Sequence, residues 1–306
     1  MNVLITGAGG FVARYLVCEL TAHGHQVYTT DVLPSVDLPN YRRADLCNSD
    51  EISQLVHEVR PDACAHLGAV SFVPDGGRDP GKLLSVNIGG TVNILSALRT
   101  EARHARFLFV STAQVYGCAL ERTDAVVSEE SPAYPLSLYT ISKCAGEQAA
   151  LAYWAYHGMD VMIARPGNHT GPGQSVRFLV ASLVAQAMRI KAGEQDCFVA
   201  GNLESERDFT DVRDVVCAYR LILERGRPGA KYNISSGNHV PLRRLLEMVQ
   251  TSVGIDAPVR IDQGLVRDTD YSRIMDTANI RALGWSPVHS LEQTILDMHN
   301  NLQSIC

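Results

Sequence analysis

The residue types with the clearest chemical use are a tyrosine and a lysine four positions apart, Tyr139 and Lys143. Both lie near the start of a predicted helix, so the phenol and the ammonium share one helical face. A nearby cation stabilises a phenolate, and such a phenol can exchange a proton with a substrate oxygen near neutral pH. A Y-x-x-x-K pair is also common by chance on a protein surface. Whether this pair is catalytic or an ordinary surface pair therefore depends on the motifs that accompany it in the chain.

A glycine-rich run near the N-terminus, GAGGFVA at residues 7–13, follows an apolar strand and opens a helix. Small residues allow a tight turn and let backbone amides approach a pyrophosphate at the helix N-terminus. Asp31 ends the next predicted strand, where its carboxylate can bind the ribose hydroxyls of an adenosine. This arrangement predicts a dinucleotide and favours NAD, while Arg42 and Arg43 leave NADP open as an alternative.

Alternating strands and helices have to position these residues. Short apolar runs at residues 3–6, 26–30, 62–67, 106–111 and 160–164 predict buried strands, and amphipathic runs at 11–22, 51–58, 83–99 and 137–156 predict helices. Continuous apolar strands separated by helices indicate βαβ units on a parallel sheet covered on both faces. The predicted fold class is therefore α/β, a Rossmann-like doubly wound parallel sheet. Ser111 and Thr112 bring hydroxyls to its carboxyl edge, where ligands bind in such folds.

The pattern loosens after Arg165, where prolines and glycines cluster in the run RPGNHTGPGQ. We expect residues 1–165 to form an NAD(P)-binding Rossmann domain and residues 166–306 to form mainly a smaller α/β substrate-binding lobe. The boundary is soft because some later segments, such as the predicted helix at 214–224, can return to the first domain.

The composition limits the partners and the compartment. A formal net charge of -6 gives no electrostatic reason to expect a nucleic acid. No apolar run approaches the roughly 18 residues of a membrane span, and the opening MNVLITGAGG does not resemble a secretory signal. Eight scattered cysteines without a C-x-x-C pair are typical of structural thiols, so we expect no metal site and a cytoplasmic location.

Together these residues resemble the extended short-chain dehydrogenase/reductase superfamily, of the nucleotide-sugar epimerase/dehydratase type, over essentially the whole chain. The order of glycine turn, Thr112, Tyr139 and Lys143 is specific to it, and the resemblance implies that these three side chains are catalytic. It also implies cofactor contacts in the first half of the chain. The residues concerned are Gly7, Gly10, Phe11, Val12, Asp31, Asp45, Leu46, Leu67, Gly68, Ala69, Asn87, Ser111, Tyr139, Lys143 and Arg165.

Two later segments resemble those of enzymes that act on nucleotide-linked sugars. The N-H-T-G-P-G-Q form at residues 168–174 looks most like GDP-4-dehydro-6-deoxy-D-mannose reductases, and RDFTDVRD at 207–214 carries the arginine that binds the diphosphate in relatives. Arginine suits this task because its planar fork makes two charge-assisted hydrogen bonds to phosphate. The resemblance implies a nucleotide-diphosphate sugar, bound by Thr112, Asn168, Arg177, Arg207 and Arg267.

Three positions depart from the pattern. Sugar-nucleotide 4,6-dehydratases resemble this chain but carry an acid pair, or at least a glutamate, directly after the catalytic threonine. Ala113 and Gln114 stand there instead, and neither can hold a proton for that purpose, so we expect no dehydration. Gly167 replaces the usual phenylalanine, which leaves the identity of the sugar open.

The resemblance therefore implies an NAD(P)H-dependent reductase of a 4-keto sugar nucleotide, with GDP-4-dehydro-6-deoxy-D-mannose to GDP-D-rhamnose as the first hypothesis. Tyr139 is expected to protonate the oxyanion formed by hydride addition at C4, Thr112 to bind the same oxygen, and Lys143 to hold the nicotinamide ribose.

Two alternatives and the assembly stay open at this point. An NAD-dependent nucleotide-sugar 4-epimerase uses the same residues and is one alternative. A non-catalytic dinucleotide sensor is the other, and the intact catalytic set argues against it. The helices at 83–99 and 137–156 resemble those that pair relatives into homodimers.

Overall fold

The computed structural model describes residues 1–71, 79–120, 126–266 and 274–300. Its centre is a sheet of seven strands in the order β10-β6-β5-β4-β1-β2-β3, and every pairing within it is parallel. The strands are β1 (Asn2–Thr6), β2 (Gln26–Asp31), β3 (Tyr41–Arg43), β4 (Ala63–His66), β5 (Arg106–Val110), β6 (Val161–Pro166) and β10 (Lys231–Ile234). The predicted doubly wound α/β fold is confirmed.

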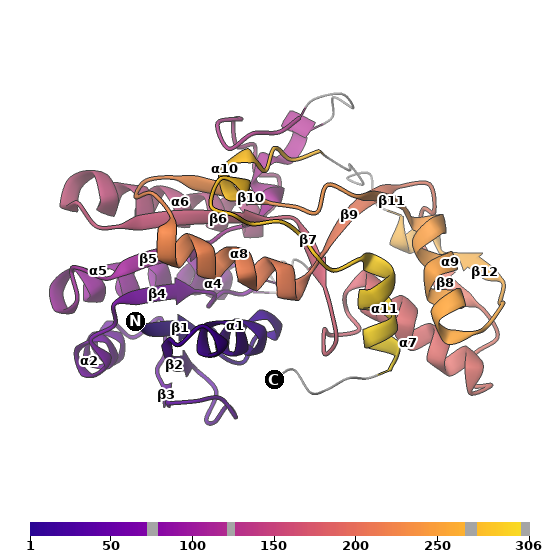
Figure 1. Ribbon diagram of the computed structural model, residues 1–306, viewed down its shortest axis with the longest axis horizontal. Helices are drawn as coiled ribbons and strands as arrows, with labels where there is room; N and C mark the ends of the chain where they lie inside the picture. The colour runs from indigo at the N-terminus through magenta and orange to yellow at the C-terminus, as the bar shows by residue number, and fades with distance from the viewer. Residues whose placement is uncertain (72–78, 121–125, 267–273, 301–306) are drawn as a thin grey trace.

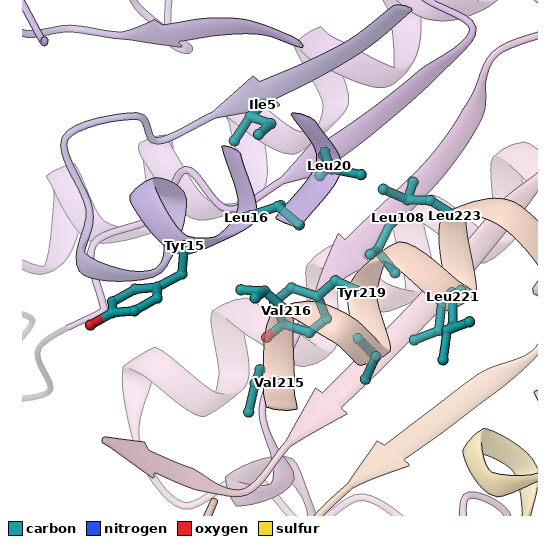
Figure 2. Packing of buried hydrophobic residues seen from close by; sticks show 14 of the residues in the cluster. Ile5, Tyr15, Leu16, Leu20, Leu108, Val215, Val216, Tyr219, Leu221 and Leu223 are labelled. Carbon is teal, nitrogen blue, oxygen red and sulfur yellow. The ribbon is translucent and has the colours of Figure 1, made fainter. Parts of the chain in front are cut away.

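Helices cover both faces of this sheet (Figure 1). On one face α1 (Phe11–Ala22) and α8 (Val212–Arg225) pack together over a core that includes Leu16, Leu108 and Tyr219 (Figure 2). On the other face α2 (Ser49–Val59), α5 (Gly90–Glu101) and α6 (Leu138–His157) pack over a second core. The central strands are therefore buried on two sides, which explains their continuous apolar sequences.

The first domain takes in two elements from the second half of the chain. Strand β10 pairs with β6 at the edge of the large sheet, and α8 lies beside α1. The predicted helix at 214–224 is α8, and its return to the Rossmann half follows from the apolar residues it shares with α1. β3 has three residues and β10 has four, and neither was predicted from the sequence.

The helix predicted at residues 83–99 is longer and irregular. It consists of α4 (Pro80–Leu84), a π-helical segment η1 (Ser85–Gly89) and α5, in one uninterrupted run. π-helical turns inside α-helices often lie at functional sites. This one contains Asn87, one of the residues for which a cofactor contact is expected.

A smaller lobe lies beside the carboxyl edge of the large sheet (Figure 1). Its three-stranded sheet has the order β11-β9-β7, and its own core is separate from the other two. The lobe and the connecting segments contain β7 (Asn168–Thr170), α7 (Leu179–Lys191), β8 (Phe198–Ala200), β9 (Glu206–Asp211), β11 (His239–Pro241), α9 (Leu242–Val253), β12 (Val259–Ile261), η3 (Gln263–Leu265), α10 (Ala278–Arg281) and α11 (Leu291–His299). Among the described residues, no helix is long and apolar enough to cross a membrane.

Candidate active site

Thr112, Tyr139 and Lys143 come together where β5 ends and α6 begins. Thr112 follows the last residues of β5, and its side chain lies close enough to the phenol of Tyr139 to lower the pKa of that phenol. The Thr112 hydroxyl oxygen also accepts a bond from the backbone N–H of Gln114 at 3.2 Å, which orients it. All three side chains are at most 9% exposed, so the fold holds them in fixed positions at the carboxyl edge of the sheet.

The start of α6 is defined by a reciprocal cap. The Ser137 hydroxyl accepts from the N–H of Thr140, and the Thr140 hydroxyl accepts from the N–H of Ser137. Such a capping box fixes the first turn of a helix. Tyr139 lies inside that turn, so its phenol has a defined direction relative to β5.

Lys143 is held by the strand rather than by the tyrosine. Its ammonium donates to the carbonyl of Val110 at 2.8 Å and lies 5.2 Å from the ring centre of Phe109. Burial lowers the pKa of Lys143 to about 8, and the carboxylate of Glu147, one turn along α6, acts in the opposite direction. Glu147 therefore helps the lysine to keep its charge.

Burial dominates the acidity of Tyr139. It raises the pKa of the phenol to about 12, and the hydrogen bond from Thr112 offsets this only in part. Burial, and not the charge of the nearby lysine, therefore sets the direction of this shift in the protein itself. Tyr139 consequently carries its proton at neutral pH.

A buried chain of hydrogen bonds supports this corner. The side chain of Asn87 accepts from the N–H of Val70 at 2.8 Å and donates to the hydroxyl of Ser142 at 2.9 Å. Ser142 in turn donates to the carbonyl of Tyr139 at 2.7 Å. The Asn87 side chain thus connects the segment after β4 to the first turns of α6, which carry Tyr139 and Ser142.

His66 extends the same chain towards β1. Its ring nitrogens lie 2.8 Å from the Thr6 hydroxyl and 3.1 Å from the Thr91 hydroxyl. Burial lowers the pKa of His66 to about 3, so the ring stays neutral and is a structural link between β1, β4 and α5.

The glycine turn has the geometry that a dinucleotide needs. Gly7 has a φ of 78°, and a Cβ there would lie 2.7 Å from the backbone nitrogen of Gly68, so the turns after β1 and β4 touch through bare backbone. Gly10 caps α1 without any side-chain hydrogen bond, and no acidic residue lies in the first turn, which begins with Phe11 and Val12. The amides at this helix end are therefore suited to a pyrophosphate.

Asp31 fixes the loop beside this turn. Its carboxylate accepts from the N–H of Gly9 at 3.0 Å and of Leu33 at 3.2 Å. The carboxylate is only partly buried and lies directly beside the glycine turn, as the interaction with a ribose requires. Arg42, the rival anchor for a 2′-phosphate, is exposed on β3, and Arg43 lies 3.7 Å from Glu51.

Four other residues expected to contact the cofactor lie around the end of β4. The Leu46 side chain packs against Gly68 and Gly90, where an added Cβ would approach it to 2.6 and 2.9 Å. Asp45 caps the following turn by accepting from the N–H of Cys47 at 2.8 Å. Leu67 and Ala69 flank Gly68 at the carboxyl edge, and both are partly buried.

Arg165 has a different environment from the one expected. Its guanidinium makes a bidentate pair with Glu147 at 2.9 and 2.6 Å and donates to the Glu129 carbonyl, and both charged side chains are at most 3% exposed. The guanidinium also stacks 4.8 Å from the ring centre of Tyr116. Since its donors are engaged inside the protein, this side chain joins β6 to α6, and a cofactor contact at Arg165 stays a prediction.

Sequence reasoning overlooked Glu147. It lies four residues after Lys143, the same spacing that drew attention to Tyr139, so the signal was present. Glu147 connects the lysine to Arg165 and is 1% exposed.

The residues expected to bind the sugar nucleotide are less closely grouped. Asn168 lies on β7 opposite Phe209, and Arg207 lies two residues earlier on β9, so both belong to the small sheet. Arg177 is exposed in the segment before α7, and Arg267 lies outside the described residues. Ser111 is buried next to Thr112.

The acids in the RDFTDVRD segment are structural. The Asp208 carboxylate accepts from Ser235, Ser236 and the N–H of Gly237. Asp211 caps α8, and Asp214 binds the loop that leads to α11. Through these three acids, the segment anchors the C-terminal part of the chain.

A family model described as GDP-mannose 4,6 dehydratase matches residues 4–298, so the chain belongs to this family. This agrees with the predicted epimerase/dehydratase type of extended short-chain dehydrogenase/reductase. A GDP-6-deoxy-D-mannose reductase from Pseudomonas aeruginosa is 34% identical over 297 residues, which cover 96% of this chain and 94% of that protein.

Solved structures agree with this assignment. RMD from Pseudomonas aeruginosa complexed with NADPH matches with a TM-score of 0.88 and 32% identity, covering 99% of both chains. A UDP-glucose 4-epimerase from Thermus thermophilus complexed with NAD matches with a TM-score of 0.86 and 26% identity, again over 99% of both chains. The fold is thus shared with both structures over nearly the whole chain.

Proposed function

We propose that this protein is an NAD(P)H-dependent reductase of a 4-keto sugar nucleotide, converting GDP-4-dehydro-6-deoxy-D-mannose to GDP-D-rhamnose. The similarity to the GDP-6-deoxy-D-mannose reductase extends over nearly all of both chains and supports this choice of substrate. The observation that carries the chemistry is the buried Tyr139 beside the buried Thr112, with a phenol that burial keeps protonated at neutral pH. A reductase needs a proton donor at this position.

Tyr139, Thr112 and Lys143 have different roles in the proposed reaction. When bound, the reduced nicotinamide supplies hydride to C4 of the sugar. Tyr139 donates its proton to the C4 oxygen, and Thr112 holds that oxygen by a hydrogen bond. Lys143 binds the nicotinamide ribose, and its charge favours the phenolate that Tyr139 becomes.

Ala113 and Gln114 limit the reaction to reduction. They follow Thr112 in a 3-10 helix, η2 (Ala113–Leu120), and neither side chain can take a proton from the sugar or give one to it. Although the family is named for a dehydratase, we expect this member to leave the C5 and C6 positions of its substrate unchanged.

The preferred dinucleotide depends on Asp31. A carboxylate at this position hydrogen-bonds ribose hydroxyls and repels a 2′-phosphate, which favours NADH. NADPH is the second candidate because RMD is complexed with it and because Arg42 and Arg43 lie near the end of β2.

The binding site for the sugar nucleotide is proposed on the smaller lobe, with residues 1–165 binding the dinucleotide. Asn168 and Arg207 of the small sheet and Arg177 before α7 are its candidate contacts, together with Thr112 and Arg267. Because Arg207 is partly buried, its fork has a more defined direction than that of the exposed Arg177.

The enzymatic test uses the 4-keto sugar nucleotide with NADH and NADPH in separate reactions, followed by the loss of nicotinamide absorbance. We expect oxidation equal to the amount of GDP-D-rhamnose formed, and no keto sugar when GDP-mannose is supplied alone. Absence of oxidation with every 4-keto nucleotide sugar would refute the proposal.

A 4-epimerase remains the second candidate, because the epimerase from Thermus thermophilus shares the fold over the whole chain. Such an enzyme retains its NAD between turnovers. Purified protein that carries one tightly held NAD and interconverts two nucleotide sugars without added cofactor would favour this alternative.

We also propose a homodimer formed through α5 and α6. Val92, Leu138, Ile141 and Tyr156 on these helices are exposed apolar side chains, between 36% and 84% exposed. Light scattering of the wild type and of Ile141→Glu tests this, with a dimer and a monomer as the expected results. A cytoplasmic location fits the free thiols of Cys47, Cys64, Cys144, Cys197 and Cys217.

A further inference from the structure

One hydrogen bond links the helix of the glycine turn directly to the segment after β7. The hydroxyl of Tyr15 on α1 donates to the carbonyl of Pro172 at 2.6 Å, and these residues are 157 positions apart. Tyr15 is 5% exposed and lies at the margin of the core beneath α1, with its hydroxyl directed away from Leu16 and Leu20 (Figure 2). The bond therefore lies between the two parts of the molecule that are proposed to bind different ligands.

The packing around this bond is tight. A Cβ on Gly171 would lie 2.7 Å from Cγ1 of Val212 and 3.6 Å from Cζ of Phe11. Phe11, the first residue of α1, meets the Tyr15 ring edge-on at 5.5 Å. Residues 171 and 172 are thus enclosed by the first turns of α1 and α8, and a shift of either turn would be felt at Pro172.

The surrounding charges keep the Tyr15 hydroxyl a donor. Burial and the carboxylates of Asp211 and Asp297 raise its pKa to about 12, although Arg213 opposes them. Asp211 accepts from Arg213 at 2.7 Å and from the Thr294 hydroxyl at 2.6 Å, so its carboxylate is itself fixed by α8 and α11. The hydroxyl cannot lose its proton in the neutral range, and its bond to Pro172 persists.

The position of Tyr15 relates the two ligand sites. Its helix begins at the glycine turn, where a dinucleotide would order the amides of α1. Its acceptor lies in the segment 168–174, which starts at Asn168 and leads through Arg177 to α7. A ligand that orders one end of this connection reduces the ordering cost for the ligand at the other end.

We propose that Tyr15 is a positioning residue that couples dinucleotide binding at the glycine turn to nucleotide-sugar binding at residues 168–174. The inference rests on the proposed function, because it requires both ligands. It assigns Tyr15 no contact with either of them. Its effect passes through the Pro172 carbonyl, so it changes the affinity of one ligand in the presence of the other.

The test is the coupling factor, measured by calorimetry. GDP serves as the probe for the sugar-nucleotide site, titrated with and without saturating NADPH or NADH, whichever binds more tightly. We expect wild-type protein to bind GDP about 5-fold to 150-fold more tightly with the dinucleotide present, the usual range for such coupling. Tyr15→Phe keeps the ring and loses the bond, and we expect its factor to approach one in both orders of addition.

Two further variants separate coupling from general damage. Tyr232→Phe removes the hydroxyl of another buried tyrosine, which accepts from the N–H of Arg227 at 2.8 Å. We expect this variant to keep the wild-type coupling factor. Gly171→Ala pushes the segment away from Val212 while retaining Tyr15, and we expect it to lower the factor as Tyr15→Phe does. This variant carries the test if Tyr15→Phe does not fold.

The outcomes are distinguishable. A wild-type factor of one, or a wild-type factor retained by folded Tyr15→Phe or by Gly171→Ala, would overturn the coupling while the proposed function stands. A wild-type protein that binds neither GDP nor another nucleoside diphosphate would instead overturn the proposed function, and the inference with it.

Discussion

The carboxyl edge of the large sheet and the small sheet beside it hold their candidate functional residues in opposite ways. At the large sheet Thr112, Tyr139 and Lys143 are buried, and the ammonium of Lys143 donates to the Val110 carbonyl of β5. At the small sheet Asn168 is exposed, and its amide makes one long bond of 3.4 Å to the Asp208 carbonyl.

This difference separates the chemistry from the choice of substrate. A proton and a hydride require fixed geometry, which buried and mutually bonded side chains provide. The small sheet has three strands against the seven of the large sheet, and Asn168 on it and Arg177 beyond it are exposed. If the sugar nucleotide binds at the small sheet as proposed, we expect changes there to alter which sugar nucleotide is bound and to leave Thr112, Tyr139 and Lys143 in place.

The largest effect is expected from Tyr139→Phe, which removes the proton donor but keeps the ring. Positioned general acids contribute about 10²-fold to 10⁴-fold, so we expect kcat to fall by that factor with KM for the sugar nucleotide nearly unchanged. Tyr153→Phe on the same helix, which loses a bond to Ser96, provides the control and should retain activity. Steady-state kinetics would contradict the assignment if Tyr139→Phe kept more than a tenth of wild-type kcat.

The next largest effect is expected from the buried ion pair of Arg165 and Glu147. Arg165→Met leaves the Glu147 carboxylate buried without its partner, and breaking a buried pair in this way costs about 3–5 kcal/mol. Arg244→Met removes the exposed pair with Glu247 and should cost about 0–1 kcal/mol. Urea unfolding measures both. Equal losses for the two variants would show that Arg165 is not a structural link.

The sequence was sufficient to predict the layout around Tyr139 because local rules decide it. Three signals are short-range: the alternation of apolar strands with helices, the glycine turn at Gly7 and the helical spacing from Tyr139 to Lys143. The local sequence determines each of them. The carboxyl edge of a parallel sheet then brings Thr112 to the same place without further information.

The sequence could not give the environment of Arg165. Whether an arginine meets a ligand or a carboxylate depends on which residues of α6 face β6, a tertiary choice that the run RPGNHTGPGQ does not contain. The burial that raises the pKa of Tyr139 is likewise a property of the folded chain, which no local pattern contains. The bond between Tyr15 and Pro172 joins residues too far apart for any pattern to relate them.

An intermediate effect is expected at the small sheet. A charge-assisted bond contributes about 1.5–3 kcal/mol, so Arg207→Ala should raise KM about 10-fold to 100-fold while kcat changes little. Arg207→Lys keeps the charge without the planar fork, so its KM should lie between those of wild type and Arg207→Ala. Arg243→Ala on α9, which removes an exposed pair with Glu204, is the control. If kcat fell as strongly as KM rose, Arg207 would belong with the catalytic corner rather than with substrate binding.

The smallest effect is a pH dependence of stability at Lys143. Its pKa is about 8 in the folded protein and 10.5 for an unperturbed lysine, so between these values the unfolded chain holds a proton that the folded protein has released. Stability must then rise with pH across this window, by up to about 1.4 kcal/mol per pH unit for one proton.

Unfolding free energies of wild type and Lys143→Met, compared at pH values of about 7.5, 8.5 and 9.5, isolate this contribution because the other groups titrate in both proteins. We expect the unfolding free energy of wild type to rise relative to that of Lys143→Met as pH rises. Lys191→Met removes an exposed lysine that donates to the Val253 carbonyl. Its unfolding free energy should show the same pH dependence as that of wild type. A constant difference between wild type and Lys143→Met would mean that Lys143 keeps its proton across this range. The buried corner would then tolerate charge as readily as the exposed lobe.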